Sequence, residues 1–240
     1  MDEFIEKLSN AESVLFITGA GVSKASGIPT YRGAGGIYNN FLIPPEILMS
    51  SFVFNYFPWL TWNVFKKAYE AYKDVSPNDA HEVIALMELF IDKVHVITQN
   101  VDGLHVACGN VSVAEMHGTF KPFKCTKCNK VYNEYRGSHC ECGSYLKPDV
   151  VLFGDLLPEK AVNKYHEILE SKPDVVVVCG TTANFEYIVR PAREAFDDGR
   201  FVVVIDPVFP TNLRGCVNSW IKEPCEKVLP EVLNNLKFKN

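Results

Sequence analysis

Short apolar runs are the dominant pattern along the chain, and they predict buried strands. Four such runs, rich in Val and Ile, lie at residues 14–18, 94–98, 175–179 and 201–205. Because they lack a regular apolar and polar alternation, we expect parallel strands that are covered on both faces. Helical spacing follows Asn78, a predicted N-cap. The alternation of strands and helices predicts an α/β fold, a doubly wound, Rossmann-like parallel sheet.

Two stretches interrupt this alternation and predict a second, smaller domain. Residues 37–73 are strongly aromatic and carry three prolines, which indicates a helical insertion that covers an apolar surface. Residues 119–147 hold four cysteines and few aliphatic side chains, so they cannot form a core of their own. We therefore divide the chain into three parts. The nucleotide-binding domain comprises residues 1–36, 92–118 and 148–240. The helical insertion with a cofactor-covering loop spans 37–91, and the cysteine module spans 119–147.

Composition and charge exclude some classes of function. The chain has 240 residues, with 24 Lys and Arg against 29 Asp and Glu, and it has no basic block. We therefore expect no direct binding of nucleic acid. The first ten residues carry acids where a signal peptide carries bases, and no apolar run is long enough to span a bilayer. A cytoplasmic protein without membrane contact is the expectation.

A glycine-rich loop follows the first predicted strand. Residues 18–23 read Thr-Gly-Ala-Gly-Val-Ser, a setting in which backbone N–H groups favour a phosphate. Lys24 stands where the dinucleotide fingerprint has its third glycine, and no acidic residue lies between Glu12 and Glu46. Either a plain strand-to-helix turn or a nucleotide held differently from that of a dehydrogenase explains the loop.

The cysteine spacing predicts a metal site. Cys125 and Cys128 form one close pair, and Cys140 and Cys142 form a second pair after eleven intervening residues. Four thiolates can close a tetrahedral zinc site and give a core-poor loop its folding energy. A site that uses His139 in place of Cys140, or a redox pair, is the alternative.

Several motifs together resemble one family. After the glycine-rich loop come Ser-Gly-Ile-Pro-Thr-Tyr-Arg-Gly at 26–33, Thr-Gln-Asn-Val-Asp-Gly-Leu-His at 98–105, His-Gly at 117–118, Pro-Asp-Val-Val-Leu-Phe-Gly-Asp at 148–155 and Gly-Thr-Thr at 180–182. In this order they are similar to the motifs of the sirtuins, which are NAD-dependent protein deacylases. The resemblance implies NAD as cosubstrate, a structural zinc ion, and transfer of an acyl group from lysine to ADP-ribose.

The resemblance also implies roles for particular residues. His117 takes the place of the family's catalytic base, and Asn100 belongs to the catalytic site; a plain Asn and Asp turn is the alternative explanation for residues 100–102. The expected NAD contacts are Gly19, Ala20, Gly21, Lys24, Thr30, Tyr31, Arg32, Gln99, Asn100, Val101, Asp102, His117, Gly180, Thr181, Thr182, Asp206 and Cys225. Val151 and Phe153 are the expected contacts to the acyl-lysine substrate, and Cys125, Cys128, Cys140 and Cys142 the expected zinc ligands.

The sequence departs from the family pattern at informative positions. Ile37 and Asn40 stand where the branch that removes acidic acyl groups carries Tyr and Arg, so a succinyl group loses its donors. We expect deacetylation; the aromatic insertion either lines a channel for an acyl chain or packs as ordinary core. Pro191 lies farther from Gly180 than the family's Pro-Ala pair does, which puts the peptide geometry in doubt.

Other functions keep the same site. Protein ADP-ribosylation or NAD hydrolysis would use NAD with another acceptor, and a non-catalytic sensor would bind without turnover. The retained His117 argues against the two enzyme alternatives, because a base is needed for acyl migration. The intact set of motifs argues against the sensor. We expect a monomer that acts on acyl-lysine proteins or peptides.

Overall fold

The large domain is built on a parallel sheet, as the apolar runs predict. The computed structural model describes residues 1–30 and 43–236. Six parallel strands run in the order β3-β2-β1-β7-β8-β9. Their bounds are Ser112–Glu115, Lys93–Thr98, Ser13–Thr18, Val175–Cys179, Phe201–Ile205 and Ser219–Ile221. The doubly wound fold class is thereby confirmed, and the four apolar runs are its central strands.

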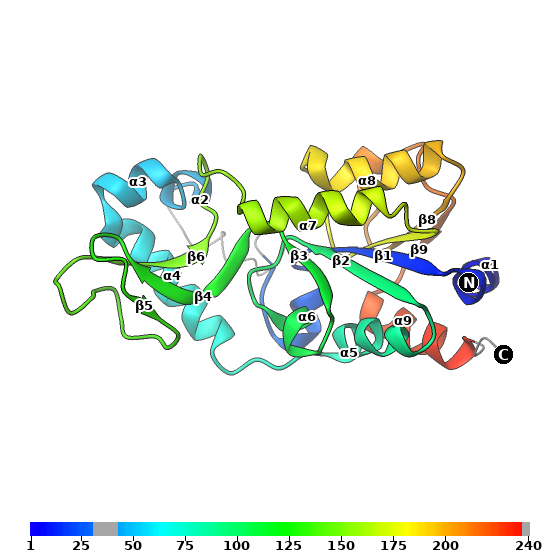
Figure 1. Cartoon of the computed structure of the whole chain (residues 1–240), viewed down its shortest axis with the longest axis horizontal. Coiled ribbons are helices and arrows are strands. Elements are labelled where there is room, and N and C mark those ends of the chain that lie inside the picture. The colour runs from blue at the N-terminus through cyan, green and yellow to red at the C-terminus, as the bar shows by residue number, and fades with distance from the viewer. Residues whose placement is uncertain (31–42, 237–240) are drawn as a thin grey trace.

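Helices cover both faces of this sheet (Figure 1). On one face lie α1 (Asp2–Asn10), α5 (Asp79–Leu86), which continues into the 3-10 turn η3 (Met87–Leu89), and α9 (Cys225–Asn235). The other face carries α7 (Glu159–Glu170), α8 (Glu186–Asp197) and the turn η4 (Thr211–Leu213). All five residues of β7 are buried, and burial of each valine contributes about 1.5–3 kcal/mol. Apolar burial on two faces therefore holds this domain.

A second, smaller domain lies beyond one end of the sheet (Figure 1). An antiparallel sheet in the order β5-β4-β6 spans Val131–Tyr132, Gly118–Cys125 and Leu146–Val150. Two helices pack against it, α3 (Ser51–Tyr56) and α4 (Pro58–Tyr72), and α2 (Pro45–Leu48) contacts these two helices. The aromatic insertion supplies the apolar core that the cysteine module lacks, because Trp62 and Phe65 pack with Phe123.

The segment that precedes β2 is divided between the two domains. Residues 79–86 pack in the core of the large sheet, whereas α3 and α4 pack on the small one. The division of the chain at 37, 91, 119 and 147 stays a prediction. Helix α1 and the last described helix α9 lie toward the end of the large domain that is far from the small one (Figure 1).

Candidate functional site

The carboxyl ends of the central parallel strands meet at one edge of the sheet. Thr18, Thr98 and Cys179 are register partners, so the loops after β1, β2 and β7 start side by side. The glycine-rich loop continues into the 3-10 helix η1 (Val22–Ser26) rather than into a long α-helix. This edge is where open α/β sheets bind their ligands.

Two glycine loops are packed against each other at this edge. The Gly21 N–H donates to the Gly180 carbonyl oxygen at 2.8 Å. A Cβ on Gly21 would lie 2.6 Å from the Gly180 Cα, and a Cβ on Gly19 would lie 2.8 Å from the Thr181 Cβ. Only glycine permits this approach, which leaves the loop backbone accessible to a phosphate.

A buried polar network lies below the glycine-rich loop. The Asn100 side chain is 4% exposed, and its Nδ2 donates to the Gly19 carbonyl at 3.1 Å and to the Ser23 Oγ at 3.0 Å. Ser23 in turn donates to Asp102 at 2.7 Å, and Gln99 donates to the Thr181 Oγ1 at 2.6 Å. The motif after β2 and both glycine loops therefore form one connected unit, which a plain Asn and Asp turn would not need.

Two buried histidines extend this network, and no sequence motif marks the first of them, His81. The His81 Nε2 lies 3.5 Å from the Ser23 Oγ, and the ring packs beside His105. His105 bonds the Thr18 Oγ1 at 3.0 Å, and burial lowers its pKa to about 3. Burial also lowers the pKa of His81. Both rings therefore stay neutral near pH 7 and support the loop.

His117 follows β3 and is held in one orientation. Its Nδ1 lies 2.9 Å from the Gln99 carbonyl oxygen, which can only accept, so Nδ1 carries the proton. The Nε2 is therefore the free base nitrogen, and it lies 2.6 Å from the Tyr187 hydroxyl. Burial lowers the pKa of His117. A neutral imidazole with a defined base nitrogen is suited to accept a proton.

Glu115 precedes this histidine and was not singled out from the sequence. Burial, together with the charges of Asp102 and Asp149, raises its pKa to about 6. Glu115 ends the short strand β3, Ser-Val-Ala-Glu. Because this segment is short and mixed in polarity, the sequence does not predict that its glutamate is buried.

The predicted substrate residues lie where the chain returns from the small domain. The Val151 N–H donates to the His117 carbonyl at 2.9 Å, so any contact to an acyl-lysine amide falls to the Val151 carbonyl. The Phe153 side chain is 42% exposed, while its backbone bonds Met49 and Ser51. Val151 lies beside His117, and Phe153 is accessible for a substrate.

The other predicted NAD contacts spread along the same edge. Asp206 follows β8; burial raises its pKa, and the Val208 N–H donates to its Oδ1 at 2.8 Å. Cys225 begins α9, and its thiol donates to the Glu226 Oε2 at 3.7 Å. Ala20 and Val101 line a cavity of about 10 Å³, room for about one water. Lys24 and Thr182 are exposed and Thr30 is half-buried; Tyr31 and Arg32 lie outside the described residues.

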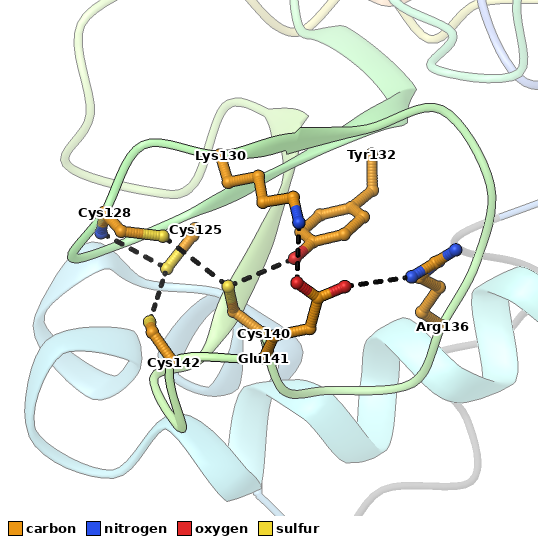
Figure 2. A network of polar contacts seen from close by, with 8 residues as sticks. All are labelled: Cys125, Cys128, Lys130, Tyr132, Arg136, Cys140, Glu141 and Cys142. Carbon is orange, nitrogen blue, oxygen red and sulfur yellow. Dashed lines mark hydrogen bonds and ion pairs between the residues drawn. The ribbon is translucent and has the colours of Figure 1, made fainter.

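The four cysteines of the module converge on one point. Figure 2 shows their side chains turned toward one another. The Sγ atoms of Cys125 and Cys142 are 3.5 Å apart, those of Cys128 and Cys140 are 3.6 Å apart, and all four lie within 4.8 Å. A tetrahedral zinc ion with Zn–S bonds of about 2.3 Å requires S···S distances of about 3.8 Å, so the cluster fits zinc.

The alternatives for the cysteines find no support in this geometry. His139 bonds Ser138 at 2.9 Å and packs on Tyr145, outside the sulfur cluster. All eight cysteines are free thiols. Around the cluster, the exposed Glu141 pairs with Lys130 and Arg136 (Figure 2), which contributes little energy at the surface.

Fold and site together define a class of protein. It has a doubly wound domain whose strand ends carry two glycine loops, and a neutral histidine at the same edge. Strand β4, which leads into the cysteine module, starts at the residue after this histidine. The Sir2 family profile matches residues 19–186. The chain belongs to the Sir2 family.

Curated relatives and solved structures agree with this membership. The NAD-dependent protein deacylase 2 of Pseudomonas aeruginosa is 33% identical, with 96% of this chain and 95% of that protein covered. The NAD-dependent protein deacylase 1 of Caldanaerobacter subterraneus is 37% identical, with 84% and 85% covered. The crystal structure of a Sir2 homologue in complex with NAD superposes with a TM-score of 0.86 at 28% identity, covering 98% of this chain and 93% of that one.

None of the helices in the described part of the chain combines the length and the apolar character that a membrane-spanning segment needs.

Proposed function

We propose that this protein is an NAD-dependent protein-lysine deacylase and that acetyl is its preferred acyl group. The single observation that carries the proposal is the state of His117, which is neutral and oriented through Nδ1, with its basic lone pair on Nε2. The family and the names of its curated members support the deacylase activity.

The residues of the edge fit NAD. When bound, NAD supplies the ADP-ribose that accepts the acyl group, with nicotinamide as the leaving group. Gly19 to Gly21 and Thr181 would hold the phosphates, Asp206 a ribose hydroxyl, and Asn100 with Asp102 the polar end of the cleft. The crowding at Gly21 and Gly180 leaves no side chain in the way of the phosphates, which is the structural sign of this fit.

His117 would move the proton. Its Nε2 accepts a proton from a ribose hydroxyl, while the Gln99 carbonyl keeps Nδ1–H in place. A positioned general base of this kind contributes about 10²–10⁴-fold to a rate. Because burial lowers the pKa of His117, the base is already neutral at pH 7.

The four cysteines would hold a structural zinc ion. They lie in the small domain, Cys125 at the end of β4 and the other three on the loops next to β4 and β6, and none of them belongs to the polar network of the edge. Zinc there would stabilise the fold of the module and take no part in proton transfer.

The preference for acetyl rests on the sequence. Ile37 and Asn40, which offer no charge to a succinyl carboxylate, lie outside the described residues. A monomeric state, a cytoplasmic location and the absence of direct nucleic-acid contact stay predictions.

The test is product analysis with one peptide whose lysine carries an acetyl, a succinyl or a long-chain acyl group. With NAD, we expect nicotinamide, the free lysine peptide and O-acetyl-ADP-ribose in equal amounts, with acetyl turned over fastest. Free ADP-ribose with an unchanged peptide would establish a glycohydrolase, and ADP-ribosylated protein a transferase. NAD binding in calorimetry without any product would establish a sensor.

A further inference from the structure

The segment between Gly180 and Pro191 is anchored over the edge of the sheet. Ala183 adopts a left-handed conformation with φ of 49°. Its N–H donates to the Thr181 Oγ1 at 3.1 Å, and its carbonyl accepts from the Asn212 Nδ2 at 3.0 Å. The chain then enters α8, with Pro191 inside the helix. This geometry carries the first turn of α8 to His117.

Two aromatic rings of this segment cover His117. Phe185 packs edge-on against the imidazole, with ring centroids 5.7 Å apart, and stacks on Tyr187 at 5.4 Å. The Tyr187 hydroxyl lies 2.6 Å from the His117 Nε2. Because Nδ1 carries the ring proton toward Gln99, Nε2 must accept and the phenol must donate.

Both groups stay neutral in this contact. Burial raises the pKa of Tyr187 to about 12 and lowers that of His117. Transfer of the phenol proton would leave a charged pair that burial disfavours on both sides. The contact is therefore an ordinary hydrogen bond, and the phenol keeps its proton.

This hydrogen bond occupies the nitrogen that the reaction uses. Nε2 has one lone pair, so it cannot accept from the phenol and from a ribose hydroxyl together. Resting on the proposed function, we propose that Tyr187 is a positioning residue that holds His117 through Nε2 until a ribose hydroxyl of the substrate replaces the phenol.

Replacement needs only a small movement. Tyr187 is half-buried, and a turn about its side-chain bonds frees the imidazole while the backbone of α8 stays in place. Substrate binding then loses one hydrogen bond at Nε2 and gains another. The cost appears in substrate binding, and the proton transfer itself is unchanged.

The test compares Tyr187→Phe with the wild-type protein. The variant keeps the ring stack on Phe185 and loses only the hydroxyl. We expect the KM for NAD to fall about threefold to tenfold with kcat unchanged, since one neutral hydrogen bond no longer has to be exchanged. We also expect the pKa of His117 in the free protein, measured by NMR titration, to rise, because a donor that favours the neutral ring is removed.

Tyr165→Phe is the matched control. Tyr165 lies on α7, is 4% exposed, and its hydroxyl has no hydrogen-bond partner among the described residues. Removal of this hydroxyl should leave both the KM and the His117 titration as in the wild type.

The outcomes separate the possible roles. A fall of kcat by a hundredfold in Tyr187→Phe would make Tyr187 a proton relay and overturn the proposal. An unchanged His117 titration, equal to that of the control, would also overturn it. The titration requires no turnover, so an inactive wild-type protein would count against the proposed function and leave this test intact.

Discussion

The edge of the large sheet and the cysteine module hold their polar groups by opposite means. At the edge, Asn100, Ser23 and Asp102 bond one another on a scaffold that apolar strands already hold. In the module, four sulfur atoms face one another across a loop with few aliphatic residues, and its apolar core comes from α3 and α4. We therefore expect the first region to stay folded when it loses a polar group, and the second to depend on its metal.

The two regions meet at His117. Strand β4 begins at Gly118, the next residue, and β6 ends at Val150, so Val151 bonds the His117 carbonyl directly after the chain returns. The module therefore brackets the base at both of its connections. Disorder in the module should therefore lower the activity by disturbing His117, even though the cysteines take no part in the reaction.

The largest expected effect tests the dependence on metal. Cys140→Ser should abolish stoichiometric zinc in metal analysis and open residues 119–147 to limited proteolysis, because structural zinc contributes about 10 kcal/mol or more to such modules. Deacylation should fall at least tenfold with the module, since Val151 and His117 lose their mutual support.

Cys108→Ser, outside the cluster and half-buried, is the control and should keep both zinc and activity. If Cys140→Ser retained one zinc per chain, the four-cysteine site would be wrong.

The base should be separable from the fold. His117→Ala should lower formation of O-acetyl-ADP-ribose by about 10²–10⁴-fold, the range of a positioned general base, with zinc content and melting temperature near those of the wild type. Mass spectrometry of the products measures this. The exposed His166 provides the control His166→Ala, which should act as wild type. A product yield within twofold of wild type for His117→Ala would remove the histidine from its role.

The junction of the two regions should be destabilised by a single added methyl group at Gly118. Gly118 has a φ of 72°, and a Cβ there would lie 2.0 Å from the Asp149 carbonyl oxygen. Gly118→Ala combines left-handed strain with overpacking, so we expect a loss of about 2–5 kcal/mol in the free energy of unfolding.

Gly137 isolates the strain component. It has a φ of 85°, and no atom of the described residues comes within 4 Å of the position that a Cβ would take there. Gly137→Ala should therefore cost only about 1–2 kcal/mol. The free energy of unfolding of both variants is measured by urea denaturation. Equal losses would show that the backbone segments at Gly118 and Asp149 are not tightly packed.

Acid should affect the sheet edge through its buried histidines. The pKa of His105 is about 3 in the folded state against about 6.5 unfolded, so the unfolded state binds more protons as pH falls below 6.5. Stability is therefore full above pH 6.5 and is lost toward pH 3, with a loss of about 2 kcal/mol already at pH 5. His105→Gln should flatten this part of the stability curve.

The sequence predicted most of the large domain and little of its packing. Valine-rich runs such as 175–179 can be buried only on two faces, so they indicated the central strands directly. The edge strands β3 and β9 were not predicted, because Ser112–Glu115 and Ser219–Ile221 are short and mixed in polarity. The Asn78 cap was predicted, and its helix does begin at Asp79.

The site was predicted in proportion to how local its signals are. Contiguous motifs indicated Gly19 to Gly21 and Gln99 to Asp102, and the cysteine pairs indicated the sulfur cluster. The contacts of His81 and Tyr187 arise from segments distant in sequence, 58 residues apart for His81 and Ser23 and 70 for Tyr187 and His117, so no local pattern marks them. Only the folded arrangement brings them together.

The positions of α1 and α9 have a practical consequence for the experiments above. Helix α1 and the C-terminal end of α9 lie at the end of the large domain opposite the small one (Figure 1). A fusion tag or a surface tether attached at α1 or at the C-terminal end of α9 is far from the small domain, so a whole folded protein carrying the acyl-lysine can still approach His117. Immobilised protein can thus be offered complete protein substrates as well as short peptides.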